Sequence, residues 1–222
     1  MFGIKGSRWF VLCVFLILCA SATGAVAAGP VPEPPTCITV LPAISTACPS
    51  PSQSQTSRVA SAEGGQSSQA RALSVTATPS LARLLVGEVN RIRRAHHLRS
   101  LANSARLSRA GTEHAMALAT AGVFTHSWPT TGRLFSSWIR TFYPPQGYRT
   151  WMAGENLLWS SPGFMSADAV QQWLDSPMHR RVLLTSSWRE LGIGVVSAVA
   201  APGAYGGQDV QIAAAEFGLR RP

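Results

Sequence analysis

The sequence contains little charge and little cysteine, and both shortages limit what the protein can be. Charged residues make up 13% of its 222 residues, hydrophobic residues make up 46%, and there are four cysteines. This balance excludes a disordered polyampholyte and a membrane bundle. Lysine occurs once, so the formal charge of +9 comes almost entirely from arginine. The G-x-S-x-G, H-E-x-x-H, Walker and Rossmann motifs are also missing. The sequence therefore lacks the common signatures of hydrolases and nucleotide-binding proteins.

The beginning of the chain has the pattern of a secretory signal peptide. Lys5 and Arg8 precede the apolar run at residues 9–20, and the small residues Ala25-Val26-Ala27 follow as a cleavage signal. An uncleaved anchor is the alternative, because residues 9–28 could just span a bilayer. Polar residues dilute the end of that run and favour cleavage. We therefore expect residues 1–28 to be removed and the protein to be secreted or extracytoplasmic.

Cleavage would change the composition of the mature chain. It would remove Lys5 and Arg8, leaving 17 basic residues, all arginine, against 10 acidic residues and a net charge of +7. Cys37 and Cys48 would remain, and in an oxidising compartment they predict a small disulfide loop, with two free thiols as the alternative. An exported basic protein is expected to meet anionic envelope components rather than nucleic acid.

The composition then divides the remaining chain into a linker and a domain. Residues 29–79 are rich in proline, serine and alanine and lack any periodicity, so they predict a disordered linker. Residues 80–222 are long enough to bury a substantial core. We expect helices starting at Ser80 and Ser166, helices at 104–121 and 132–142, a helix junction at Ser176-Pro177, and strands at 191–199 and 209–217. Helices followed by a hairpin indicate an α+β fold with an antiparallel sheet covered by helices.

Several short motifs in this domain occur in the order and spacing of one known family. They include Phe124-Thr125-His126, Gly154-Glu155-Asn156, Ser176-Pro177-Met178-His179-Arg180, Leu191-Gly192-Ile193-Gly194-Val195 and Phe217-Gly218. With them, residues 81–218 strongly resemble the CAP superfamily of cysteine-rich secretory, antigen 5 and pathogenesis-related 1 proteins (SCP domains), in its exported bacterial form.

The resemblance implies an α-β-α sandwich with a cleft that carries two histidines and two glutamates. Carried over by motif, the cleft residues here are His126, Glu155 and His179, with Asn156 beside them. The second glutamate of eukaryotic members corresponds to Ser176, which follows Asp175. The chain therefore keeps three of the four positions.

Two imidazoles and one carboxylate are a ligand set suited to zinc, so a site formed by His126, Glu155 and His179 is one prediction. His179 would be the third residue of its helix, where the helix dipole favours the neutral imidazole that binds metal. Gly154 is expected to allow a tight turn that aims Glu155 inward. The alternative is a metal-free hydrogen-bond network that fixes the packing. His114, among alanines and leucines, is predicted to be a structural histidine with its partners satisfied.

Three functions follow from these residues. The first is an exported, monomeric binding or interaction module whose ligand is a lipid, a sterol or an anionic envelope component. The second is a hydrolase, acting on protein or wall polymer, in which Glu155 is the general base for water held by His126 and His179. The third is a stable domain in which the trio only supports the fold.

Overall fold

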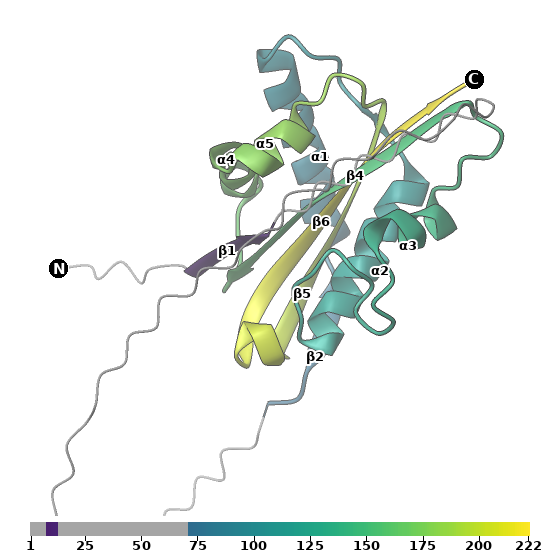
Figure 1. The fold of residues 1–222 in the computed structure, drawn as a ribbon. Helices are drawn as coiled ribbons and strands as arrows, with labels where there is room; N and C mark the ends of the chain where they lie inside the picture. The colour runs from purple at the N-terminus through teal and green to yellow at the C-terminus, as the bar shows by residue number, and fades with distance from the viewer. Residues whose placement is uncertain (1–7, 13–70) are drawn as a thin grey trace, which may run out of the picture. The chain divides into compact units, whose positions relative to one another are not determined.

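The computed structural model describes residues 8–12 and 71–222, which form a six-stranded sheet with helices on both faces (Figure 1). The strand order is β1–β4–β6–β5–β2, and all these neighbours are antiparallel. β3 pairs in parallel with β5. The strands are β1 Arg8–Leu12, β2 Ser74–Ala77, β3 Ala102–Asn103, β4 Thr150–Ser161, β5 Glu190–Ala201 and β6 Gln208–Arg221. Residues 29–70 of the predicted linker, with Cys37 and Cys48, lie outside the described residues. The last part of that predicted linker is not disordered, because it forms β2, which pairs with β5, and the first residue of the first helix.

Within the described residues, five α-helices cover the sheet, and they confirm the predicted α+β fold. They are α1 Pro79–Ala95, α2 Ala105–Ala121, α3 Phe135–Phe142, α4 Ser166–Asp175 and α5 Pro177–Leu183. α1, α4 and α5 share an apolar core with one face of the sheet. α2 packs on the opposite face, where α3 joins it. We refer to these as the α5 face and the α2 face.

Local sequence signals account for several helix ends. α1 starts at Pro79, after Thr78, and not at the predicted Ser80. α2 starts after Ser104 and ends at Gly122, whose φ of 67° is the left-handed conformation expected of a glycine cap. Ser176 ends α4 and precedes Pro177, the first residue of α5, as predicted. The third helix begins at Phe135, three residues later than Gly132, because Gly132 adopts a φ of 67° in the preceding turn.

Glycines let α2 lie directly against strand β5. A Cβ atom added to Gly194 would lie 2.0 Å from the backbone nitrogen of Thr112, and one added to Gly192 would lie 2.0 Å from that of Ser108. On the helix side, a Cβ on Gly111 would lie 2.6 Å from the carbonyl oxygen of Ala214. This close approach fixes the position of α2 across the sheet and thereby the position of His114.

The expectation of a turn at Gly154-Glu155-Asn156 was wrong. These residues lie inside β4, where Gly154 pairs with Phe217 of β6. A Cβ on Gly154 would lie 2.9 Å from the Trp188 ring, so the glycine makes room for that indole and does not form a bend. β4 is buried on both faces and therefore lacks the alternation that marks a half-exposed strand.

Strand β1 falls within the predicted signal peptide. Its five residues pair with Leu157–Ser161 of β4 at one edge of the sheet. Cleavage would remove this strand and expose the edge of β4, and the signal peptide itself remains a prediction. Among residues 8–12 and 71–222, no helix is both long and apolar enough to cross a membrane.

Candidate functional site

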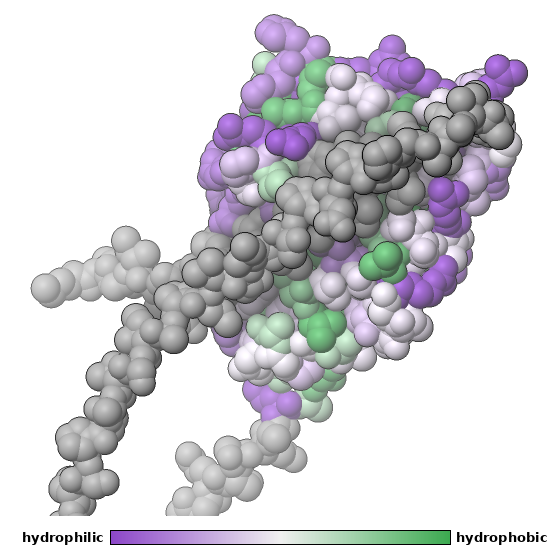
Figure 2. Space-filling model, viewed as in Figure 1, coloured by the Kyte–Doolittle hydropathy of each residue, from purple (hydrophilic) through white to green (hydrophobic). Residues whose placement is uncertain are grey.

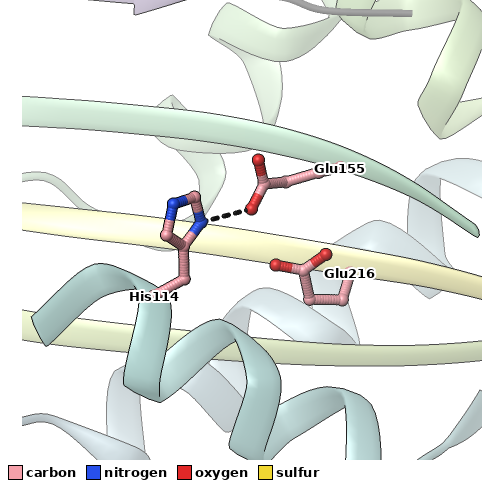
Figure 3. Close-up of side chains that lie close together, drawn as sticks. All are labelled: His114, Glu155 and Glu216. Carbon is pink, nitrogen blue, oxygen red and sulfur yellow. Dashed lines mark hydrogen bonds and ion pairs between the residues drawn. The ribbon is translucent and has the colours of Figure 1, made fainter. Parts of the chain in front are cut away.

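Two glutamates face each other across strands β4 and β6. Glu155 of β4 is directly opposite Glu216 of β6 in the strand register. Paired residues of neighbouring strands project from the same face of a sheet. Both side chains extend toward His114 of α2, which places them on the α2 face (Figure 3). Glu155 is 1% exposed and Glu216 is 0% exposed, so both carboxyl groups are removed from water.

Each carboxylate oxygen of Glu155 accepts a hydrogen bond from a different imidazole. His114 Nδ1 donates to Glu155 Oε1 at 2.6 Å, and His126 Nδ1 donates to Oε2 at 2.5 Å. His114 Nε2 lies 3.3 Å from the carbonyl oxygen of Ser127. The indole N–H of Trp138 donates to the carbonyl oxygen of His126 at 2.9 Å and holds the loop between α2 and α3 in place. Glu155 is therefore the centre of a connected network.

The two carboxyl groups differ in their electrostatics. Burial alone raises the pKa of Glu155, but its interactions with His114 and then His126 outweigh burial and hold the pKa below its ordinary value. Burial raises the pKa of Glu216 well above its ordinary value, and the neighbouring Glu155 carboxylate raises it further. Neither oxygen of Glu216 has a hydrogen-bond partner within the described part of the chain. The pair thus consists of a carboxylate bonded to two imidazoles beside a carboxyl group whose raised pKa favours the protonated form.

Aromatic rings cover the imidazole side of this network. The Trp138 ring centroid lies 4.5 Å from that of His114, and the Trp128 ring stacks on His114 at 5.8 Å with an interplanar angle of 17°. His114 is fully buried and His126 is 4% exposed. The network therefore forms a closed centre rather than an open cleft. We define this polar centre as His114, His126, Glu155 and Glu216.

His179 lies on the other side of the sheet. It belongs to α5, and its Nδ1 is 2.7 Å from Ser176 Oγ. Its carbonyl oxygen accepts a hydrogen bond from Asn156 Nδ2 at 3.1 Å, so Asn156 does not bond within a turn of its own. Adjacent strand residues project to opposite faces, which separates Asn156 from Glu155. The structure thus brings His126 and Glu155 together and places Asn156 and His179 on the α5 face.

This separation bears on the predicted zinc site. A zinc ion needs its ligand atoms about 2.0–2.2 Å away, converging on one point. Both oxygens of Glu155 point to His114 and His126, while His179 is held by α5 and bonded to Ser176. His126, Glu155 and His179 therefore do not fit one ion.

Sequence reasoning missed Glu216 and did not link His114 to Glu155. His114 has partners, as predicted, but they include the candidate site residue itself. Glu216 was detectable as a lone acidic residue in the apolar run Ala213-Ala214-Ala215-Glu216-Phe217. An acidic residue inside a buried strand is costly and rarely kept without a role. Its partner could not be read from the sequence, because the β4–β6 register was unknown.

An open surface lies next to the closed centre, over α2 and α3. One pocket of about 180 Å³ is lined by Trp128, Thr131, Arg133, Trp138, Thr141 and Phe142. A second pocket of about 460 Å³ is lined by Arg106, Arg109, Thr141 and Phe142. The two pockets share Thr141 and Phe142 and so form one continuous surface, the α2–α3 surface. Hydrophilic and hydrophobic side chains lie close together over these helices (Figure 2).

Comparison with solved structures shows the same fold in a bacterial outer surface protein. An outer surface protein of Borrelia burgdorferi matches with a TM-score of 0.54 and 19% identity, over 67% of this chain and 98% of that one. An extracellular protein with an SCP domain from Bacillus anthracis matches with a TM-score of 0.44 and 25% identity, over 65% and 41% of the two chains. A cysteine-rich secretory protein from Staphylococcus aureus gives 0.42 and 17%, over 64% and 39%.

No curated protein matched the chain. The family model of the cysteine-rich secretory proteins matches residues 86–202. This match confirms the resemblance found in the motifs. Since it spans more than half of the 222 residues, the chain belongs to the CAP, or cysteine-rich secretory protein, family.

Proposed function

We propose that this chain is an exported binding module that takes an anionic saccharide of the cell envelope onto its α2–α3 surface. The observation that carries the proposal is the pair of open pockets that share Phe142, with aromatic rings in one and arginines beside both. Ligand pockets typically combine apolar walls with a few polar groups that fix orientation. The closed polar centre offers no such opening.

The aromatic part of this surface suits a sugar ring. Trp128 and Phe142 stack with ring centroids 6.1 Å apart and an interplanar angle of 29°, and Trp128 is only partly buried. Trp138 supports them from beneath, with its ring 5.4 Å from Trp128. The C–H groups on the face of a pyranose pack well on such rings. Thr131 and Thr141 add hydroxyl groups for hydrogen bonds at the pocket wall.

The arginines supply the preference for an anionic sugar. Arg106, Arg109 and Arg133 line the two pockets and are exposed, and Arg109 lies 5.9 Å from the centre of the Phe142 ring. Glu113, 4.0 Å from Arg109, is the neighbouring acid. Guanidinium groups bind carboxylate and phosphate with matched geometry. A polymer carrying such groups could therefore satisfy both parts of the surface.

Hydrolysis by Glu155 is less well supported. A general base needs a free oxygen within reach of a water molecule and substrate. Both oxygens of Glu155 accept imidazole hydrogen bonds, and His179 lies on the other face. Binding therefore fits this geometry better than hydrolysis does.

Export is supported by the N-terminal pattern and by the relatives. The similar structures come from an outer surface protein, an extracellular protein and a secretory protein. Mass spectrometry of protein released from a secreting bacterial host would test the predicted removal of residues 1–28. Retention of Arg8–Leu12 in the released protein would instead keep β1 in the sheet.

Binding can be tested with hexagalacturonate, a carboxylated oligosaccharide, and its methyl-esterified form, which has the same backbone without charge. We expect the wild-type chain to prefer the charged form and Trp128→Ala to weaken binding about tenfold, a loss of about 1.4 kcal/mol. Arg109→Gln should weaken it about two- to fivefold and reduce its salt dependence.

Exposed residues elsewhere provide matched controls. Leu84→Ala and Arg94→Gln both change α1, on the other face of the sheet, and should leave binding unchanged. Thermal unfolding of Trp128→Ala checks that the stacked His114 is undisturbed. Equal binding of the charged and esterified sugars, or binding only to anionic lipid vesicles, would contradict the proposal.

A further inference from the structure

Glu216 is a fully buried carboxyl group without a hydrogen-bond partner among the described residues, and it points at His114 and Glu155 (Figure 3). Burying such a group without a partner is unfavourable. We propose that Glu216, Glu155 and His114 form a zinc site between α2, β4 and β6. This site is independent of the saccharide-binding surface, and it excludes His179.

The three side chains already surround one point. One ligand atom from each, a carboxylate oxygen of Glu155, a carboxylate oxygen of Glu216 and a ring nitrogen of His114, lies within 4.8 Å of the other two. Ligand atoms around zinc lie about 3.3 Å apart when each is about 2.0 Å from the metal. Zinc would replace the proton on His114 Nδ1, and the imidazole proton would be carried by Nε2, which lies 3.3 Å from the Ser127 carbonyl oxygen. The 2.6 Å contact between His114 Nδ1 and Glu155 Oε1 would lengthen slightly, and Glu216 would move slightly inward. Both shifts are within the reach of side-chain rotation.

The groups behind these three side chains support the same interpretation. A histidine that binds metal through one ring nitrogen commonly donates the other N–H to a backbone carbonyl, and a ligating carboxylate is commonly hydrogen-bonded in turn. His114 Nε2 lies 3.3 Å from the Ser127 carbonyl oxygen, with Nδ1 directed at Glu155. The second oxygen of Glu155 is held by His126 Nδ1. His126 would thus orient Glu155 without binding the ion.

Charge and ligand type favour zinc. Two carboxylates and a dipositive ion are neutral together, which suits a centre with no water-exposed surface. One imidazole with two carboxylates is a common zinc ligand set, whereas calcium and magnesium prefer oxygen ligands alone. Three protein ligands leave one coordination position for a water molecule.

The competing arrangement is a proton shared between the two carboxyl groups. A protonated Glu216 would be neutral and would need no metal. The two arrangements differ in their response to Glu216→Gln, which is neutral and of the same size. This variant preserves a proton-sharing pair in its neutral state but removes a metal ligand.

The test is zinc content and affinity of the full chain. Protein expressed with zinc should carry one ion per chain by native mass spectrometry, and chelation should lower its Tm. Glu216→Gln should remain folded and bind zinc more than about 100-fold more weakly, beyond the 10–100-fold typical of losing an outer partner. His179→Gln should bind zinc within about twofold of wild type. A Cys37→Ser/Cys48→Ser variant should also retain the ion.

Some results would overturn the site. They are wild-type protein without stoichiometric zinc, or Glu216→Gln with wild-type affinity, or loss of the ion in His179→Gln. If Glu216→Gln does not fold, Glu216→Asp, which withdraws the carboxylate by one methylene group, provides the second test with the same expected loss.

Discussion

The two faces of the sheet use buried polar residues in different ways. On the α5 face, buried Arg93 donates to the carbonyl oxygens of Leu183 and Thr185, and Asn156 donates to that of His179. These bonds tie side chains to backbone and hold α1 and α5 in place. On the α2 face, His114, His126, Glu155 and Glu216 meet one another. The contrast is that buried polar side chains tie helices to backbone on one face, whereas on the other they are titratable groups gathered in one network.

The largest expected effect concerns how closely each face packs. Gly194→Ala would put a Cβ 2.0 Å from the α2 backbone, so we expect it to destabilise the protein by about 4 kcal/mol or more. Gly87→Ala in α1, where the added Cβ meets nothing within 4 Å, should stabilise by about 0.4–1 kcal/mol. Urea unfolding measures both. Gly87 is exposed and serves as the control for a glycine without a close contact. Similar effects of the two substitutions would contradict the close approach of α2 to β5.

The two opposed glutamates should respond differently to neutralisation. Glu155→Gln removes the acceptor for two buried imidazoles, and we expect a loss of about 3–5 kcal/mol. Glu216→Gln in metal-free protein should change stability by less than about 1 kcal/mol, because glutamine is neutral and of the same size as the protonated carboxyl group that the raised pKa of Glu216 favours. Chemical unfolding at neutral pH in the presence of a chelator measures both variants. Equal losses would show that Glu216 is a bonded member of the network.

A smaller pair of changes compares one tryptophan from each face. Trp138→Phe removes the donor to the His126 carbonyl oxygen, and Trp173→Phe removes the donor to that of Leu157. Each should cost about 1–3 kcal/mol. Only Trp138→Phe should move the NMR signals of the His126 imidazole. A comparable movement with Trp173→Phe would mean that the faces are coupled through β4.

The smallest effect concerns pH at the β5–β6 turn. The pKa of Asp209 is lowered by its hydrogen bond with Arg71 and then by the Ala200 N–H. The resulting stability is present above the unfolded-state pKa, about 3.9, and is lost as pH falls through the lower folded value. Asp209→Asn should therefore lose a little stability at pH 6 and little at pH 2. An equal loss at both pH values would exclude this carboxylate as the cause.

Local signals predicted much of the fold and only part of the polar centre. Gly122 and Ser176-Pro177 end and start helices through their own backbone preferences, and the hairpin strands β5 and β6 were expected close to their observed bounds. Strand β4 was not predicted, because a strand buried on both faces lacks the alternation of apolar and polar residues. In addition, Gly154 resembles the glycine of a turn, although it makes room for the Trp188 ring.

The polar centre depends on relations that a sequence does not display. Glu155 and His126 were identified by motif, but their neighbours His114 and Glu216 follow from the β4–β6 register and from the glycine contacts that position α2. His179 was grouped with them by the same resemblance. The alternation of β4 then divides Glu155 from Asn156 and His179.

The central claim is that Glu155 is paired with His114 and His126 across the α2 face and not with His179. Double-mutant cycles with Glu155→Gln and each histidine changed to glutamine measure this directly. We predict coupling energies of about 1–3 kcal/mol with His114 and with His126, and less than about 0.5 kcal/mol with His179. A coupling with His179 as large as that with His126 would contradict the claim.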